Sequence, residues 1–97
     1  MKQVQALKRK TGRSNIIGQR LKLARSLHKP PLTMDTLSEM LEDQADLHMS
    51  PGTIGKIEVG IRSVYDYEIA AFADVLGIST DWLLYPPKNQ KKPSSNL

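Results

Sequence analysis

The stretch 49–62, which reads MSPGTIGKIEVGIR, constrains the fold most, because it specifies a short helix together with both of its ends. Ser50 is placed to act as N-cap and to accept a hydrogen bond from a backbone N–H of the first turn. Pro51 follows at the first helical position, where its missing N–H costs nothing. Gly60 supplies the left-handed residue that often ends a helix. We therefore predict a helix over residues 50–59.

This predicted helix has two different faces. Ile54 and Ile57 lie three residues apart and share an apolar face. The other face is small, polar and basic and bears no acid; it carries Gly52, Thr53, Gly55 and Lys56. Such a face can approach a polyanion closely. A capped surface helix with two core isoleucines would show the same pattern, and the stretch alone does not separate the two interpretations.

Charge is segregated along the 97 residues. Residues 1–29 hold nine of the fourteen basic side chains and no acid, and residues 88–92 add three lysines. Residues 35–81 hold all ten acids and only two basic residues, Lys56 and Arg62. With a net charge of +4, this segregation indicates an anionic partner met by the N-terminal segment, the exposed face of the first helix and the C-terminal tail. Nucleic acid is favoured over a basic tail that has no partner.

Other classes of function have little support in the sequence. The absence of cysteine excludes disulfides and thiolate zinc sites and fits a reducing cytoplasm. No apolar run approaches the roughly 20 residues that span a bilayer, so we expect no membrane partner. His28 and His48 are isolated, and Glu42, Asp43 and Asp46 lack the spacing of a calcium loop. We expect no enzyme, no metal and no cofactor.

The rest of the chain predicts four more helices and no strand, so the expected fold is all-α with five helices. Ser14 or Asn15 caps the first helix, which runs to about Leu27. Its apolar stripe comprises Ile17, Leu21, Ala24 and either Leu27 or His28. Arg20, Lys22 and Lys29 lie off that stripe, and we expect Arg20 on the surface. The residues before Pro30 and Pro31 cannot easily stay helical, which ends this helix.

The second helix begins at the N-cap Thr33 and turns Leu37, Met40 and Leu41 inward. Its end is open: the helix either continues to Ala45 or gives way to an acidic loop over 42–49. The fourth helix runs from about Asp66 to Leu76 and is ended by Gly77, with Ile69, Phe72, Ala73 and Leu76 inward. Ser79 or Thr80 caps a last short helix with Trp82, Leu83 and Leu84.

Three regions follow from this pattern. Residues 1–13 form a flexible basic arm, residues 14–86 the folded domain, and residues 87–97 a polar, disordered tail. We expect Trp82 and Leu83 to close the core against Ile69 and Phe72. Leu84 and Tyr85 then lie near the surface, where an apolar pair is a candidate dimer contact.

Four segments in this order and spacing resemble a known family; they are IGQRLKLAR, LTMDTLSEML, SPGTIGKIEVG and IAAFADVLGISTDWLL. Together they are similar to the Cro/phage-repressor helix-turn-helix family, also called XRE-type or lambda-repressor-like. The resemblance covers about Ile16 to Tyr85, and TIGKIEVG and the run 69–84 are its most specific parts. It implies a transcription regulator that binds double-stranded DNA, usually as a homodimer, in the cytoplasm of a bacterium or encoded by a phage.

The resemblance also implies roles for single residues. It places the helix 50–59 in the major groove, with Ser50, Pro51, Gly52, Thr53 and Lys56 where the family meets bases and nearby phosphates. The backbone amides of Thr33 and Met34 fall at a phosphate site, and Arg62 at another phosphate contact. Arg25 and Glu58 match an ion pair between the first and third helices. The charge pattern adds Arg20 and the arm residues Lys8, Arg9, Lys10 and Arg13 as phosphate contacts.

The sequence departs from the family pattern at two helix starts and in one connection. Met34 and Pro51 stand where members commonly carry glutamine, and neither can bond adenine in bidentate fashion. Eight residues, three of them acidic, separate Leu41 from Ser50. These departures favour an alternative: a protein-interaction module of the same fold that binds a regulatory partner.

Overall fold

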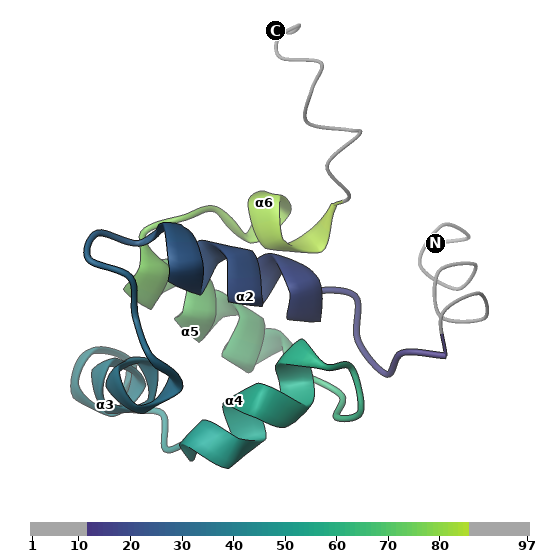
Figure 1. Ribbon diagram of the computed structural model, residues 1–97, viewed down its shortest axis with the longest axis horizontal. Coiled ribbons are helices and arrows are strands. Elements are labelled where there is room, and N and C mark those ends of the chain that lie inside the picture. Colours follow the sequence, from purple (N-terminus) through teal and green to yellow (C-terminus); the bar gives the residue numbers. More distant parts are fainter. Residues whose placement is uncertain (1–11, 86–97) are drawn as a thin grey trace, which may run out of the picture.

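The computed structural model describes residues 12–85, which contain five α-helices and no strand (Figure 1). The helices are α2 (Gly18–Leu27), α3 (Met34–Ala45), α4 (Pro51–Glu58), α5 (Asp66–Leu76) and α6 (Thr80–Leu84). They enclose one core, whose completely buried large side chains are Ile17, Leu21, Leu37, Leu41, Ile54, Ile57, Phe72 and Leu83. The expected all-helical class with five helices is confirmed for this part of the chain.

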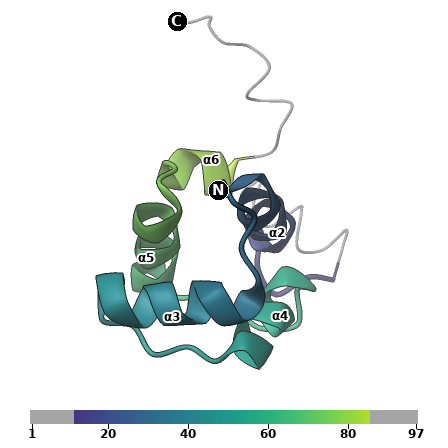
Figure 2. The ribbon, with the colours of Figure 1, turned by 60° about the vertical axis from the view of Figure 1, so that its left-hand side comes forward.

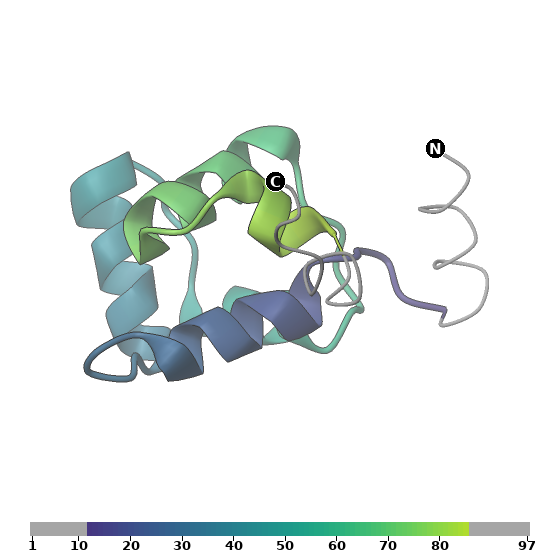
Figure 3. The same ribbon diagram turned by 90° about the horizontal axis from the view of Figure 1, so that it is seen from above.

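The helices pack around α5 and α2. Helices α3 and α4 contact each other and lie together along the lower edge of the molecule (Figure 2). Seen from above, α6 (yellow-green) lies between α5 and α2, both of which it contacts (Figure 3). Helix α2 contacts α4 as well, so α4 rests between α2 and α3. This arrangement leaves α4 at the periphery with one face inward.

Both ends of α4 have the predicted chemistry. The Ser50 hydroxyl accepts from the Thr53 N–H at 3.1 Å, and Pro51 occupies the first turn. At the other end Gly60 has φ +89°, and the N–H groups of Gly60 and Ile61 bond the carbonyls of Ile57 and Lys56 at 3.0 Å each. This pair of bonds is a Schellman motif, which satisfies two of the last carbonyls of the helix. The predicted helix is therefore confirmed.

Helix α2 begins at Gly18, two or three residues later than a cap at Ser14 or Asn15 predicts. Asn15, not Ser14, supplies the cap: its Oδ1 accepts from the N–H groups of Ile17 at 3.0 Å and Gly18 at 2.7 Å. The Asn15 amide nitrogen donates in the other direction, to the Ile57 carbonyl in α4 at 2.9 Å and to the Arg62 carbonyl at 2.8 Å. Ile17, Leu21 and Ala24 are buried as predicted, whereas Leu27 is 60% exposed.

The open question at the end of α3 is settled in favour of the longer helix. Helix α3 continues to Ala45, and Asp46 follows in the left-handed conformation with φ +53°. Five residues, 46–50, then lead to α4. The Ser38 hydroxyl donates to the Met49 carbonyl at 2.6 Å, which holds this connection against α3.

The remaining helix ends agree with the sequence. Thr33 caps α3 by accepting from the Thr36 N–H at 3.0 Å. Ser79, rather than Thr80, caps α6 by accepting from the Trp82 N–H at 3.0 Å. Gly77 ends α5 with φ +70°. Each of these caps satisfies backbone groups that a helix end leaves unpaired.

The predicted arm and tail fall mostly beyond the described residues. Lys8, Arg9 and Lys10 lie outside them, as does the tail 87–97. Gly12 and Arg13 are described, and Arg13 donates to the Glu58 carbonyl at 2.7 Å. The expected division into arm, domain and tail stays a prediction. Within residues 12–85, no helix has the length and apolar character that crossing a membrane requires.

Candidate nucleic-acid interface

The start of α3 lies against the middle of α4. A Cβ built on Gly55 of α4 would lie 3.5 Å from the sulfur of Met34, the first residue of α3. Gly55 thus gives Met34 room to cover the middle of α4. Gly55 was expected on the open face of α4, and the structure places it partly beneath Met34 instead.

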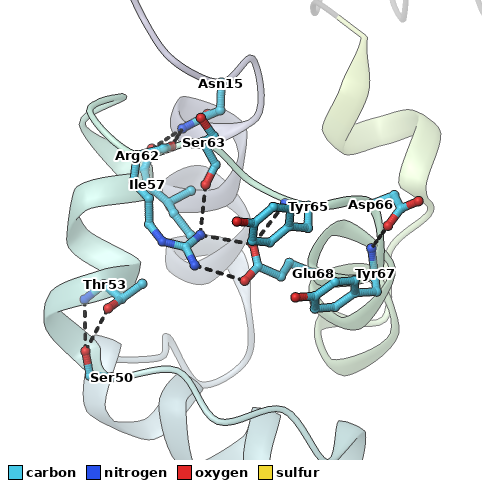
Figure 4. Close-up of polar contacts among 10 residues, drawn as sticks. All are labelled: Asn15, Ser50, Thr53, Ile57, Arg62, Ser63, Tyr65, Asp66, Tyr67 and Glu68. Carbon is cyan, nitrogen blue, oxygen red and sulfur yellow. Dashed lines mark hydrogen bonds and ion pairs between the residues drawn. The ribbon is translucent and has the colours of Figure 1, made fainter.

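The two helices start with the same pair of hydroxyls. Thr33 and Thr36 hydroxyls bond at 3.0 Å, and Ser50 and Thr53 hydroxyls bond at 2.9 Å (Figure 4 shows the second pair). Each pair joins the N-cap to the third helical residue. The Thr53 hydroxyl is therefore engaged in the cap, which is the structural role that the sequence leaves as its alternative to base contact. A hydroxyl carries two acceptor lone pairs and one hydrogen, so it keeps capacity for a second partner.

The exposed face of α4 comprises fewer residues than the sequence indicates. Gly52 and Lys56 are exposed and lie four residues apart, so they share one face. Pro51 and Thr53 are half-buried beside them. The surface at this end of α4 thus combines one cation with side chains too small to keep a ligand away from the backbone.

The expected ion pair between Arg25 and Glu58 is present and holds α4 in place. Arg25 donates from Nε and Nη2 to the two Glu58 carboxylate oxygens at 2.8 and 2.9 Å, and from Nη1 to the Leu32 carbonyl at 2.8 Å. The Glu58 side chain is only 3% exposed. Hydrogen bonding to Glu58 raises the pKa of Arg25. One guanidinium therefore ties α2, α4 and the segment before α3 together.

Arg62 is held by an acid that sequence reasoning missed. It donates to both Glu68 carboxylate oxygens at 3.0 Å and to the Ser63 carbonyl at 2.8 Å (Figure 4). Glu68 also accepts from the Tyr65 N–H at 3.0 Å and so caps α5. Burial pushes the pKa of Glu68 upward, but the bonds from Arg62 and Tyr65 outweigh it and leave that pKa below its usual value. Arg62 was expected to contact phosphate, and in the structure its charge is paired within the protein.

Arg20 and Arg13 also differ from expectation. Arg20 is 8% exposed; its guanidinium lies 3.7 Å from the centroid of the Trp82 ring, and Nε donates to the Trp82 carbonyl at 2.9 Å. Burial lowers the pKa of Arg20. Arg13 donates to the Glu58 carbonyl at 2.7 Å. The expectation that Arg20 lies on the surface is wrong, because a half-buried tryptophan offers its ring and carbonyl to a planar cation.

The described domain therefore divides its cations by type. Its four arginines make internal contacts, and its three lysines, Lys22, Lys29 and Lys56, are exposed. An arginine fork satisfies several fixed acceptors at once, whereas a lysine ammonium is a strongly hydrated point charge. Residues 12–85 hold ten acids against seven basic residues, so the positive charge of the chain comes from residues 1–11 and 86–97.

Two aromatic residues complete the surface beside α4. Tyr65 and Tyr67 are exposed and stacked, with ring centroids 5.6 Å apart (Figure 4). Glu68 is the third helical residue of α5, the position from which a glutamate can accept from the N-cap backbone N–H; with Tyr65 at the cap in place of Ser or Thr, the sequence carries only half of that signal. Leu84 is half-buried and Tyr85 is 47% exposed, so the dimer contact expected there stays a prediction.

Metal binding finds no support in the described part of the chain, where no three His, Asp or Glu side chains are grouped to hold an ion. His48 lies 3.6 Å from Glu42, and both are well exposed.

Comparisons of the chain with protein-family models, with curated proteins and with solved structures found no match.

Proposed function

We propose that the chain is a DNA-binding transcription regulator of the helix-turn-helix type that places α4 in the major groove. The observation that carries the proposal is the exposed face of α4: small side chains beside one exposed lysine, Lys56, on a helix fixed by the Arg25–Glu58 pair. An α-helix fits the major groove, and small residues allow its backbone to approach base edges and phosphates. The resemblance to the Cro/phage-repressor family supports the same assignment.

The start of α3, where Met34 lies against Gly55 of α4, provides a second element of this surface. The backbone amides of Thr33 and Met34 at the start of α3, and those of the first turn of α4, lie at the positive end of each helix dipole, where an anionic oxygen is favoured. Asp35 is exposed in the first turn of α3 and would oppose a phosphate there. We therefore assign the main contact to α4 and a lesser one to the start of α3.

Residues 1–11 and 86–97 supply most of the affinity in this proposal. Because the described domain has more acids than bases, it alone would be repelled by a polyanion at long range. The two flanking segments hold seven basic residues and no acid. Contacts from such segments neutralise phosphates without reading sequence, so the protein reads few bases and depends on phosphates and DNA shape.

A regulatory protein partner is the second candidate function. The observation that favours it is the exposed acidic side of α3 and of the connection that follows; its residues are Glu39, Glu42, Asp43 and Asp46. These side chains would be repelled by phosphates and suit a basic protein surface. Under this alternative the same fold binds a partner, and DNA is not its ligand.

Titration of a labelled duplex with the full chain at two salt concentrations separates the two functions. We expect binding at low salt that weakens steeply as salt rises. Lys56→Ala should weaken binding, whereas Lys22→Ala, which removes an equally exposed cation from α2, should change it little. A uniform loss across sequences would mark a phosphate contact, and a loss confined to one base pair a base contact. The absence of binding at low salt would contradict the proposal and favour the protein partner.

Thr53→Ala tests whether α4 reads a base directly. We expect a change of about 1–3 kcal/mol in preference at one base pair if the Thr53 hydroxyl or methyl contacts it. Amide chemical shifts give an independent measurement. If the amides of residues 50–56 and 33–35 stay unchanged on addition of DNA while others move, α4 is not the recognition helix.

A further inference from the structure

Helix α2 ends in a turn that curls around a pocket on the outside of the domain. The pocket is open to solvent and has a volume of about 390 Å³, within the roughly 300–1,000 Å³ of typical ligand sites. Six consecutive residues line it; they are Ser26, Leu27, His28, Lys29, Pro30 and Pro31. The turn lies at the left edge of the molecule, apart from α4 (Figure 1). The pocket is therefore separate from the candidate DNA-binding surface.

Hydrogen bonds hold this turn in its shape. The Leu32 N–H donates to the Arg25 carbonyl at 3.0 Å, and Arg25 Nη1 donates to the Leu32 carbonyl at 2.8 Å. The His28 N–H donates to the Ala24 carbonyl at 3.0 Å, and the His28 ring donates from Nδ1 to the Pro30 carbonyl at 3.0 Å. The two prolines of the turn restrict the backbone further. The pocket is thus pre-organised, which lowers the entropic cost of filling it.

Apolar side chains in and beside the pocket are exposed. Leu27, in the pocket wall, is 60% exposed, and Leu23, one turn earlier on α2, is 43% exposed. The two leucines lie four residues apart and so share one face of the helix. Covering them would remove apolar surface from water, which is favourable in proportion to the area covered. The pocket and the leucine face together form an apolar strip at the end of α2.

Cations flank this apolar strip. Lys22 is exposed on α2 next to Leu23, and Lys29 is exposed in the pocket wall. The ion pairs of the described domain involve neither lysine, and the first acid in the chain is Asp35. Both charges are therefore open to a partner. A ligand that combines an apolar group with negative charge is complementary to this surface.

We propose that the pocket binds an acidic peptide segment of a partner protein, with one apolar side chain in the pocket and carboxylates beside Lys22 and Lys29. An acidic peptide supplies both an apolar group and charge, whereas the phosphates of DNA supply charge alone. A second copy of the chain would offer the acidic side of α3, and such a contact between two different surfaces forms rings or open chains rather than a closed dimer. The proposal does not depend on DNA binding, which uses α4.

An NMR titration of the full chain with the peptide acetyl-EEFEE-amide tests the proposal. We expect the amide signals of Leu27, His28 and Lys29 to shift as the peptide binds. Two control peptides separate the two kinds of contact: acetyl-EEGEE-amide lacks the apolar side chain, and acetyl-QQFQQ-amide lacks the charge. Both should bind at least about tenfold more weakly. Equal binding of EEGEE, shifts confined to residues 50–56, or no shift at millimolar EEFEE would overturn the proposal.

Substitutions in the chain identify the contact. Leu27→Ser should weaken EEFEE binding by about tenfold. Lys22→Gln together with Lys29→Gln should also weaken it, and this loss should shrink as salt is raised. Val59→Ser is the matched control, because Val59 is 63% exposed but lies outside the pocket, and it should leave the affinity unchanged.

Two results would overturn the assignment of the pocket to an acidic partner. Equal losses in Leu27→Ser and Val59→Ser would show that the peptide binds exposed apolar side chains without preference. Signals of residues 27–29 that shift with the concentration of the protein alone, before any peptide is added, would assign the pocket to a second copy of the chain.

Discussion

Removal of the Arg25 guanidinium is the sharpest test of how α4 is held. Arg25 makes three hydrogen bonds of 2.8–2.9 Å, two of them to a carboxylate whose side chain is 3% exposed. Arg25→Ala leaves that carboxylate buried without its partner and leaves the Leu32 carbonyl without its donor. Breaking a buried pair in this way costs about 3–5 kcal/mol.

This cost is large against the total stability of the domain. A chain of this size has a free energy of unfolding of about 5–15 kcal/mol. At about 4–8 °C per kcal/mol, the variant should melt at least about 12 °C below the wild type. The melting temperature of Arg25→Lys should lie between those of Arg25→Ala and the wild type, because one ammonium cannot replace three donors in fixed geometry.

Thermal unfolding followed by circular dichroism measures the melting temperatures, urea unfolding measures the free energies, and a double variant separates the pair from its surroundings. Arg25→Met with Glu58→Leu removes both charges and should be less destabilised than Arg25→Ala. Glu42→Gln is the control, because its contact with His48 is exposed and should contribute less than about 1 kcal/mol. A cost below 1 kcal/mol for Arg25→Ala, or additive losses in the double variant, would refute the reasoning.

Three further predictions concern other parts of the chain. The pKa of Glu68 is lowered in the folded state, so its contribution to stability is present above the ordinary value of 4.5 and is lost as pH falls through the folded-state pKa; unfolding measured against pH should show this loss in the wild type and not in Glu68→Gln. Gly60→Ala should cost more than Gly77→Ala in urea unfolding, because both have positive φ but only Gly60 would also displace Arg13; equal costs would contradict this. Deleting residues 2–11 removes four cations and should lower the slope of log affinity against log salt by about 3–4, and an unchanged slope would show that the arm does not contact DNA.

The helix ends were the most predictable part of the fold, because their signals are local. Ser50 with Pro51, the N-cap Thr33, and the glycines at 60 and 77 each act within one turn of their own position. The start of α2 was less predictable. Asn15 bonds the backbone at the start of α2 and also the backbone at and after the end of α4. Only the folded chain brings the carbonyls of Ile57 and Arg62 to its amide.

The candidate interface was predictable in its residues but not in its charges. The sequence places Lys56, Gly52 and Thr53 on one helix, and the structure leaves Gly52 and Lys56 exposed. The sequence does not tell which arginines face inward, because that depends on partners distant in the chain. These partners are Trp82 for Arg20 and the Glu58 carbonyl for Arg13. Helical spacing alone assigns Arg20 to the surface. Spacing gives the direction of the Cβ, but it does not show that the long side chain curls back to an apolar neighbour.

The contacts of Arg13 and Asn15 with α4 have a consequence for the order of folding. The carbonyls of Ile57 and Glu58, at the end of α4, accept from side chains 42 and 45 residues earlier in the chain. Closing a loop of that length costs on the order of 3 kcal/mol in chain entropy. The caps of α4 join residues only a few positions apart, so they cost much less chain entropy. These contacts therefore form after the local caps, once α2 and α4 have docked. During synthesis Asn15 cannot make both of its bonds until residue 62 has left the ribosome.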